Sequence, residues 1–112
     1  PPCFDLVLLG LGLDGHTASL FPGGPECEER VRLCVASRAP EGSPVRDRIT
    51  LTLPLINNAK RVLFLVSGPE KKQVLWDVLA ASPSQAPQYP AQRVAPAGDL
   101  WWFTDFGLEG AT

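Results

Sequence analysis

The 112-residue sequence contains no methionine and a single histidine, His16. Because it also begins Pro-Pro, we expect a piece of a longer protein rather than a whole translation product. Its size corresponds to one small domain, and a hydrophobic content of 45% is enough for a core. Any imidazole chemistry in this chain therefore depends on one position.

The chain also lacks an excess of positive charge and any long hydrophobic run. It has 10 basic and 12 acidic residues and a formal net charge of -2 at pH 7. It therefore has no basic field for nucleic acid and no polybasic segment for a membrane surface. No apolar run approaches the roughly 20 residues of a membrane-spanning helix. We expect neither nucleic acid nor membrane as a partner.

Cysteine is scarce, with Cys3, Cys27 and Cys34 as the only three. The number is odd and no Cys-x-x-Cys spacing occurs, so the pattern indicates neither a disulfide framework nor a zinc site. Reduced thiols in the cytoplasm are the simplest expectation.

The most informative segment that is present begins with an apolar run, Phe4 with Leu6–Leu9, which predicts a strand buried on both faces. A glycine-rich turn follows and carries Asp14, Gly15 and His16. Ligands of open α/β sheets bind beyond the carboxyl ends of the strands. These three residues are therefore the first candidates for a site.

Gly10, Gly12 and Gly15 also match the G-x-G-x-x-G pattern of a dinucleotide-binding turn. The short helix expected after the turn reaches Pro22 after only HTASLF, whereas a crossover connection needs roughly ten or more residues. Asp14 would also place a carboxylate where the pyrophosphate should lie. The context therefore argues against a dinucleotide site.

Two interpretations remain for the histidine. Asp14 can orient and support the His16 imidazole across Gly15, so that a neutral ring acts as a general base. Alternatively, His16 caps the short helix or satisfies a buried carbonyl.

The rest of the chain alternates strand and helix patterns. Strands are predicted at residues 31–37, 48–53, 61–66, 91–95 and 100–104, and a short helix at 54–59. Within 48–53, Ile49, Leu51 and Leu53 share one side, which indicates a half-buried strand. A longer helix, extending to about Ala81, is predicted to start at Ser67, whose spacing to Glu70 matches a capping box. Asp105 is a candidate N-cap of a terminal helix.

Lys71 and Lys72 fall in the first turn of the helix that starts at Ser67. Cations there are disfavoured by roughly 0.3 to 1 kcal/mol each, unless an anion is bound beside them. Solvated surface lysines are the alternative, above all for Lys72. Arg48 could pair with a phosphate or with a neighbouring carboxylate, and the sequence leaves both open.

Four motifs in the same order, GLGLDGHTASLFPGG, RITLTLPLINNA, FLVSGPEK and YPAQRV with LWWFTD, cover most of the chain. Together they resemble the carboxyl-terminal half of the 6-phosphogluconolactonases. The resemblance implies an α/β fold, part of a Rossmann-like and mostly parallel sheet flanked by helices. Residues 1–112 would form the carboxyl-terminal half of a single sugar-phosphate lactonase domain, lacking its amino-terminal half.

The resemblance further implies hydrolysis of 6-phospho-D-glucono-1,5-lactone to 6-phosphogluconate, in the oxidative pentose phosphate pathway, without metal or cofactor. His16 would be the catalytic base and Asp14 would position it. Lys71, in the family's Gly-x-x-Lys, would bind the phosphate with help from Arg48. Gly12 and Gly15 are expected to contact substrate, with turn amides after Gly12 steadying the oxyanion.

Two other functions are considered. The similar glucosamine-6-phosphate deaminases share the Asp-Gly-His but continue through isoleucine and alanine into Phe-Asn-Glu-Pro, where this chain has TASLFP at 17–22. The glutamate of the deaminase acid/base group is therefore absent, which favours the lactonase. A non-catalytic sugar-phosphate sensor is the other alternative. We expect the isolated chain to be inactive and, with an uncovered apolar sheet face, prone to aggregation.

Overall fold

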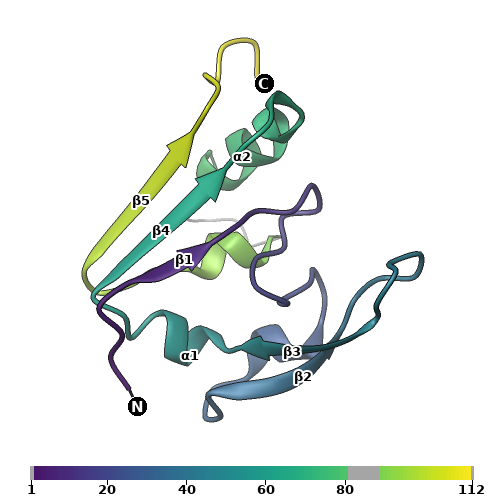
Figure 1. Ribbon diagram of the computed structural model, residues 1–112, viewed down its shortest axis with the longest axis vertical. Helices are drawn as coiled ribbons and strands as arrows, with labels where there is room; N and C mark the ends of the chain where they lie inside the picture. The colour runs from purple at the N-terminus through teal and green to yellow at the C-terminus, as the bar shows by residue number, and fades with distance from the viewer. Residues whose placement is uncertain (1, 81–88, 112) are drawn as a thin grey trace.

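The structure is a computed structural model that describes residues 2–80 and 89–111. Its main sheet has the strand order β1-β4-β5, formed by Val7–Leu9, Arg61–Val66 and Asp99–Thr104. Both strand pairs are parallel, and their carboxyl ends point the same way (Figure 1). The prediction of an α/β fold with a mostly parallel sheet is confirmed.

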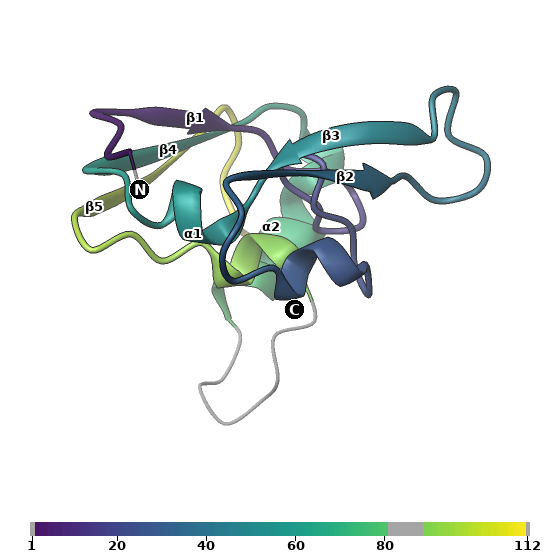
Figure 2. The ribbon, with the colours of Figure 1, turned by 90° about the horizontal axis from the view of Figure 1, so that it is seen from below.

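A second, antiparallel pair lies beside this sheet (Figure 2). It consists of β2 (Cys34–Arg38) and β3 (Asp47–Leu51). The helices are α1 (Leu53–Ile56) and α2 (Lys72–Leu79), with short 3-10 turns η1 (Pro25–Glu28), η2 (Pro69–Lys71) and η3 (Pro90–Arg93). None of the described helices has the length and apolar character needed to cross a bilayer.

The core lies between one face of the main sheet and the helices. Phe64 of β4 is fully buried there, and Trp102 of β5 stacks on it with ring centroids 3.9 Å apart. From the helical side, α2 contributes Val74, Leu75 and Val78 to the same cluster. These apolar contacts attach α2 to the sheet and set where its amino end lies.

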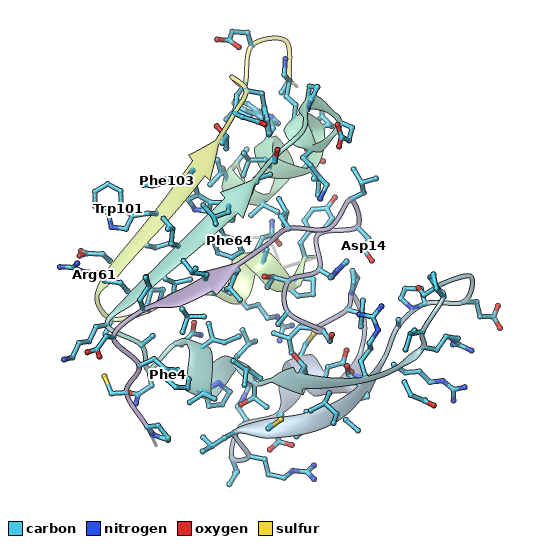
Figure 3. The ribbon with its side chains drawn as sticks, viewed as in Figure 1. Phe4, Asp14, Arg61, Phe64, Trp101 and Phe103 are labelled. Atoms are coloured by element: carbon cyan, nitrogen blue, oxygen red, sulfur yellow. The ribbon has the colours of Figure 1, made fainter. Side chains whose placement is uncertain are left out.

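The opposite face of the sheet is apolar and exposed in the described chain. Leu8 is 56% exposed, and Leu65 of β4 is also exposed. Trp101 and Phe103 of β5 are exposed as well (Figure 3). The expectation that the first strand is buried on both faces is therefore wrong, because the described helices cover only one face. The uncovered apolar face expected from the sequence is present.

The apolar side predicted for the strand at 48–53 is only partly buried, because Leu51 packs against the core and Leu53 starts α1 but Ile49 faces solvent. Ile49 is 76% exposed, whereas Thr50 and Thr52 are buried. The Thr50 hydroxyl accepts a hydrogen bond from the Ser19 amide at 3.1 Å, and the Thr52 hydroxyl donates to the Arg32 carbonyl at 2.6 Å. These bonds compensate for burying the threonines.

Four predicted local features differ from the observed ones. The segment after His16 forms turns with an isolated bridge between Thr17 and Leu20 instead of a short helix. The strand predicted at 91–95 is replaced by the 3-10 turn η3, and no helix begins at Asp105 within the described residues. Ser67 makes no cap, because its hydroxyl bonds to Asp105 and η2 precedes α2.

Candidate functional site

An open cleft of about 530 Å³ lies at the carboxyl ends of β1 and β4. This volume falls within the usual range of ligand sites, roughly 300–1,000 Å³. The cleft is lined by residues of the loop after β1 and of the segment from β4 to α2: Gly10, Leu11, Gly12, His16, Thr17, Ala18, Leu65, Ser67 and Lys71. The two segments meet because their strands are parallel neighbours in the sheet.

His16 and Asp14 form a hydrogen-bonded pair at this cleft. The ring Nδ1 lies 2.6 Å from Oδ1 of Asp14, and the same oxygen accepts the His16 backbone N–H at 3.1 Å. An ionised carboxylate can only accept, so Nδ1 carries a proton, and in the neutral ring Nε2 has the free lone pair. The ring is one-third exposed and is therefore able to exchange a proton with a molecule in the cleft.

The pair also sets the charge of Asp14. Partial burial acts to raise the pKa of the carboxyl group, but the hydrogen bonds from the His16 ring and backbone outweigh it and hold the pKa below its ordinary value. Asp14 is therefore ionised at neutral pH, with its negative charge within hydrogen-bond distance of the His16 ring.

Gly12 is required by the close approach of the imidazole. A Cβ at this position would lie 2.2 Å from Nδ1 and Cε1 of His16. The Gly12 N–H donates to the His16 carbonyl, and the Gly15 N–H donates to the Gly12 carbonyl, both at 2.9 Å. Because both amides are engaged within the turn, they are not free to bind an oxyanion. Gly15 is buried and does not line the cleft.

Lys71 lines the same cleft as His16. It is the last residue of η2 and precedes α2, and its side-chain ammonium donates to the Leu11 carbonyl in the loop after β1. The ammonium and the positive end of the helix dipole thus lie on one wall, where both favour an anion. Lys72, the next residue, instead bonds through Nζ to the Glu109 carbonyl at 3.0 Å.

Arg48 lies outside the residues that line this cleft. Its Nε donates to the Val45 carbonyl at 2.8 Å, and its guanidinium carbon lies 5.9 Å from the centre of the Phe21 ring. Phe21 in turn packs against His16, with ring centroids 4.9 Å apart. The structure therefore brings Asp14, His16, Gly12 and Lys71 together but places Arg48 against Phe21, outside the lining of the cleft.

Residues that the sequence did not single out hold the loop in place. Thr17 is buried and donates through its hydroxyl to the Gly10 carbonyl at 2.7 Å, which closes the loop on the end of β1. The Thr50 hydroxyl holds the next part of the loop by accepting the Ser19 amide N–H. Ser67 lines the cleft, and its position directly after β4 was the signal that could have identified it.

The described part of the chain offers no donor set for a metal ion. Within the ranges 2–80 and 89–111, no group of three or more His, Cys, Asp or Glu side chains could hold a metal ion. The chemistry that the described residues offer is proton transfer at His16 and electrostatic attraction of an anion at Lys71.

Comparisons with known proteins identify the family of this chain. The family model described as glucosamine-6-phosphate isomerases/6-phosphogluconolactonase matches residues 1–102. A 6-phosphogluconolactonase from Synechocystis is 48% identical over 104 residues, which cover 93% of this chain and 41% of that protein. A human "GDH/6PGL endoplasmic bifunctional protein" is 42% identical over 104 residues, covering 92% of this chain and 13% of that one.

The fold is matched as well. The crystal structure of 6-phosphogluconolactonase from Leishmania guyanensis superposes with a TM-score of 0.80 at 36% identity, covering 99% of this chain and 43% of that one. The chain thus spans less than half the length of these relatives. The relatives named above are lactonases or carry a lactonase name. The chain belongs to the glucosamine-6-phosphate isomerase/6-phosphogluconolactonase family.

Proposed function

We propose that the protein containing this chain hydrolyses 6-phospho-D-glucono-1,5-lactone to 6-phosphogluconate. One observation carries the proposal: the same cleft is lined by Lys71 and by His16, which is hydrogen-bonded to Asp14. The identity to lactonases supports the choice of substrate. Residues 1–112 are then the carboxyl-terminal half of one sugar-phosphate lactonase domain, and further substrate-binding groups come from the rest of the protein.

In the proposed reaction, Nε2 of His16 takes a proton from a water molecule as the water oxygen attacks the lactone carbonyl carbon. The tetrahedral intermediate collapses when the bond from that carbon to the ring oxygen breaks. The ring oxygen receives the proton back from Nε2, and the new carboxylic acid releases its own proton to solvent. Asp14 stabilises the protonated ring between these two steps.

Lys71 is proposed to hold the 6-phosphate. An ammonium acts on a phosphate as a point charge, and a charge-assisted hydrogen bond of this kind is about twice as strong as a neutral one. The amino end of α2 adds a favourable dipole at the same wall. Binding the phosphate at Lys71 directs the lactone ring toward His16, because both residues line one cleft.

A cytoplasmic location is also proposed. It is supported by the state of the cysteines: Cys3 and Cys34 are exposed, Cys27 is buried, and none of them is paired. Free exposed thiols are typical of a reducing compartment.

A proton-release assay tests the proposed function. The full-length protein that carries this sequence is added to freshly prepared lactone in weak buffer, and acidification is followed against the spontaneous rate. We expect acidification far above that rate, because each turnover releases one proton. Binding of the lactone without acidification would identify a sensor. Ammonia release from glucosamine 6-phosphate would identify a deaminase.

Gly12→Ala gives a further prediction. The new methyl group overlaps the imidazole, so the ring must move away from Asp14 or from the substrate. We expect kcat to fall by about a hundredfold, the cost of misplacing a reacting group by roughly 1 Å, with KM little changed. Gly10→Ala should cost far less, since a Cβ there meets no atom within 4 Å. Steady-state kinetics that show equal effects of the two substitutions would contradict this reason.

A further inference from the structure

Asp105 directly follows β5 and reaches across to the end of β4. Its Oδ2 accepts the Ser67 hydroxyl at 2.7 Å, and its Oδ1 accepts the Gly68 N–H at 2.9 Å. One carboxylate thus accepts one hydrogen bond from each of the two residues that follow β4. Asp105 does not itself line the cleft, whereas Ser67 does.

The turn that Asp105 holds has a conformation that suits glycine. Gly68 has a φ of 101°, in the region that side chains rarely adopt. The Gly68 carbonyl accepts the Lys71 N–H at 3.1 Å, and the Lys71 ammonium reaches the Leu11 carbonyl. The hydrogen bonds therefore run from Asp105 through Gly68 to Lys71 and on to the loop that carries the histidine.

The charge state of Asp105 fits this role. The Gly68 N–H, and next the Ser67 hydroxyl, hold the pKa of the carboxyl group below its ordinary value. The group is therefore ionised at neutral pH and has both oxygens available as acceptors. It also uses the only proton of the Ser67 hydroxyl, which leaves that oxygen as an acceptor toward the cleft.

We propose that Asp105 is a positioning residue for Lys71. By fixing the Ser67–Gly68 turn, Asp105 sets the position and direction of η2. It thereby places the Lys71 ammonium where it meets the phosphate of the substrate. The inference rests on the proposed function for the identity of the substrate. The binding of an anion at Lys71 does not depend on the proposed function, because it needs no turnover.

The test compares Asp105→Asn, Asp105→Ala and Ser67→Ala in the full-length protein. Asn keeps an oxygen for the Gly68 N–H, but its amide nitrogen cannot accept the Ser67 hydroxyl. Asp105→Ala loses both bonds. We expect KM for the phosphorylated lactone to rise about tenfold in Asp105→Ala and less in the other two, with kcat within about twofold, since a binding group and not the base is displaced.

Asp99→Asn is the matched control. Asp99 lies at the opposite end of the same strand, where it pairs with Arg61 at 3.5 Å. Inorganic phosphate, titrated by calorimetry, is the second readout, and its affinity should fall in parallel with KM in the Asp105 variants and in Ser67→Ala but not in Asp99→Asn. A general loss of stability would instead lower kcat and the melting temperature, without a selective rise in KM or fall in phosphate affinity.

An unchanged KM and phosphate affinity in folded Asp105→Asn and Asp105→Ala would overturn the inference, as would a fall in kcat alone. If Asp105→Ala does not fold, Asp105→Asn and Ser67→Ala decide by the same two readouts. Failure of the proposed function has a different signature: the native protein would not acidify the lactone, whereas its phosphate affinity and the effect of Asp105 on that affinity could still be measured.

Discussion

Replacing His16 by Ala in the full-length protein is expected to lower lactonase turnover by at least about a hundredfold, the low end for general acid–base catalysis. The water molecule then has no base, while the phosphate contact at Lys71 is retained, so KM should change little. The imidazole is one-third exposed, so its removal leaves no large hole in the core. Initial rates of acid release, corrected for spontaneous hydrolysis, measure the effect.

His16→Gln is the companion variant, because it keeps a polar side chain at the turn but provides no base near neutral pH. It should be as inactive as His16→Ala. Turnover within a few-fold of native in either variant would exclude His16 as the base. A melting curve for each variant shows that the fold is kept.

Lys71→Met is expected to raise KM for the phosphorylated lactone by roughly 10- to 100-fold. The estimate follows from losing a hydrogen bond to a charged group, about 1.5–3 kcal/mol, with tenfold for every 1.4 kcal/mol. Methionine keeps most of the aliphatic length, so packing beside the cleft is largely preserved. Steady-state kinetics over a wide lactone concentration range give KM and kcat separately.

Lys72→Met is the matched control for this substitution. It removes the same charge one residue further on, where the ammonium bonds to the Glu109 carbonyl and does not line the cleft. Its KM should stay within about twofold of native, since a solvent-screened charge contributes little. Equal increases in KM for the two variants would indicate a general electrostatic effect and not a phosphate site at Lys71.

Some elements could be predicted because their signals are local. Strand β4 was predicted with the observed bounds, Arg61–Val66, since an apolar run between charged and glycine-rich segments has few other ways to fold. The turn after β1 was predicted from its glycines. The close approach of the His16 ring explains why one of them, Gly12, has no side chain. The pairing of Asp14 with His16 needed only two neighbouring residues.

Other predictions failed where partners distant in sequence decide the outcome. Alternation in β3 distinguishes two faces but does not say which one is buried. Here the threonine face is buried, because Thr50 and Thr52 find backbone partners at Ser19 and Arg32. Ser67 has the spacing of a helix cap, yet its hydroxyl bonds to Asp105, which the parallel pairing of β4 and β5 brings beside it.

The sequence by itself determined strand β4, the glycine turn and the histidine–aspartate pair, because these depend on residues close together in the chain. It also carried the family resemblance, which rests on four motifs in the same order. Only the tertiary structure decided that Lys71 shares a cleft with His16, that Arg48 lies against Phe21, and that Asp105 holds the turn before Lys71. The physical reason is that parallel strands align the loops that follow them, and the order and register of those strands are set by packing across the whole sheet.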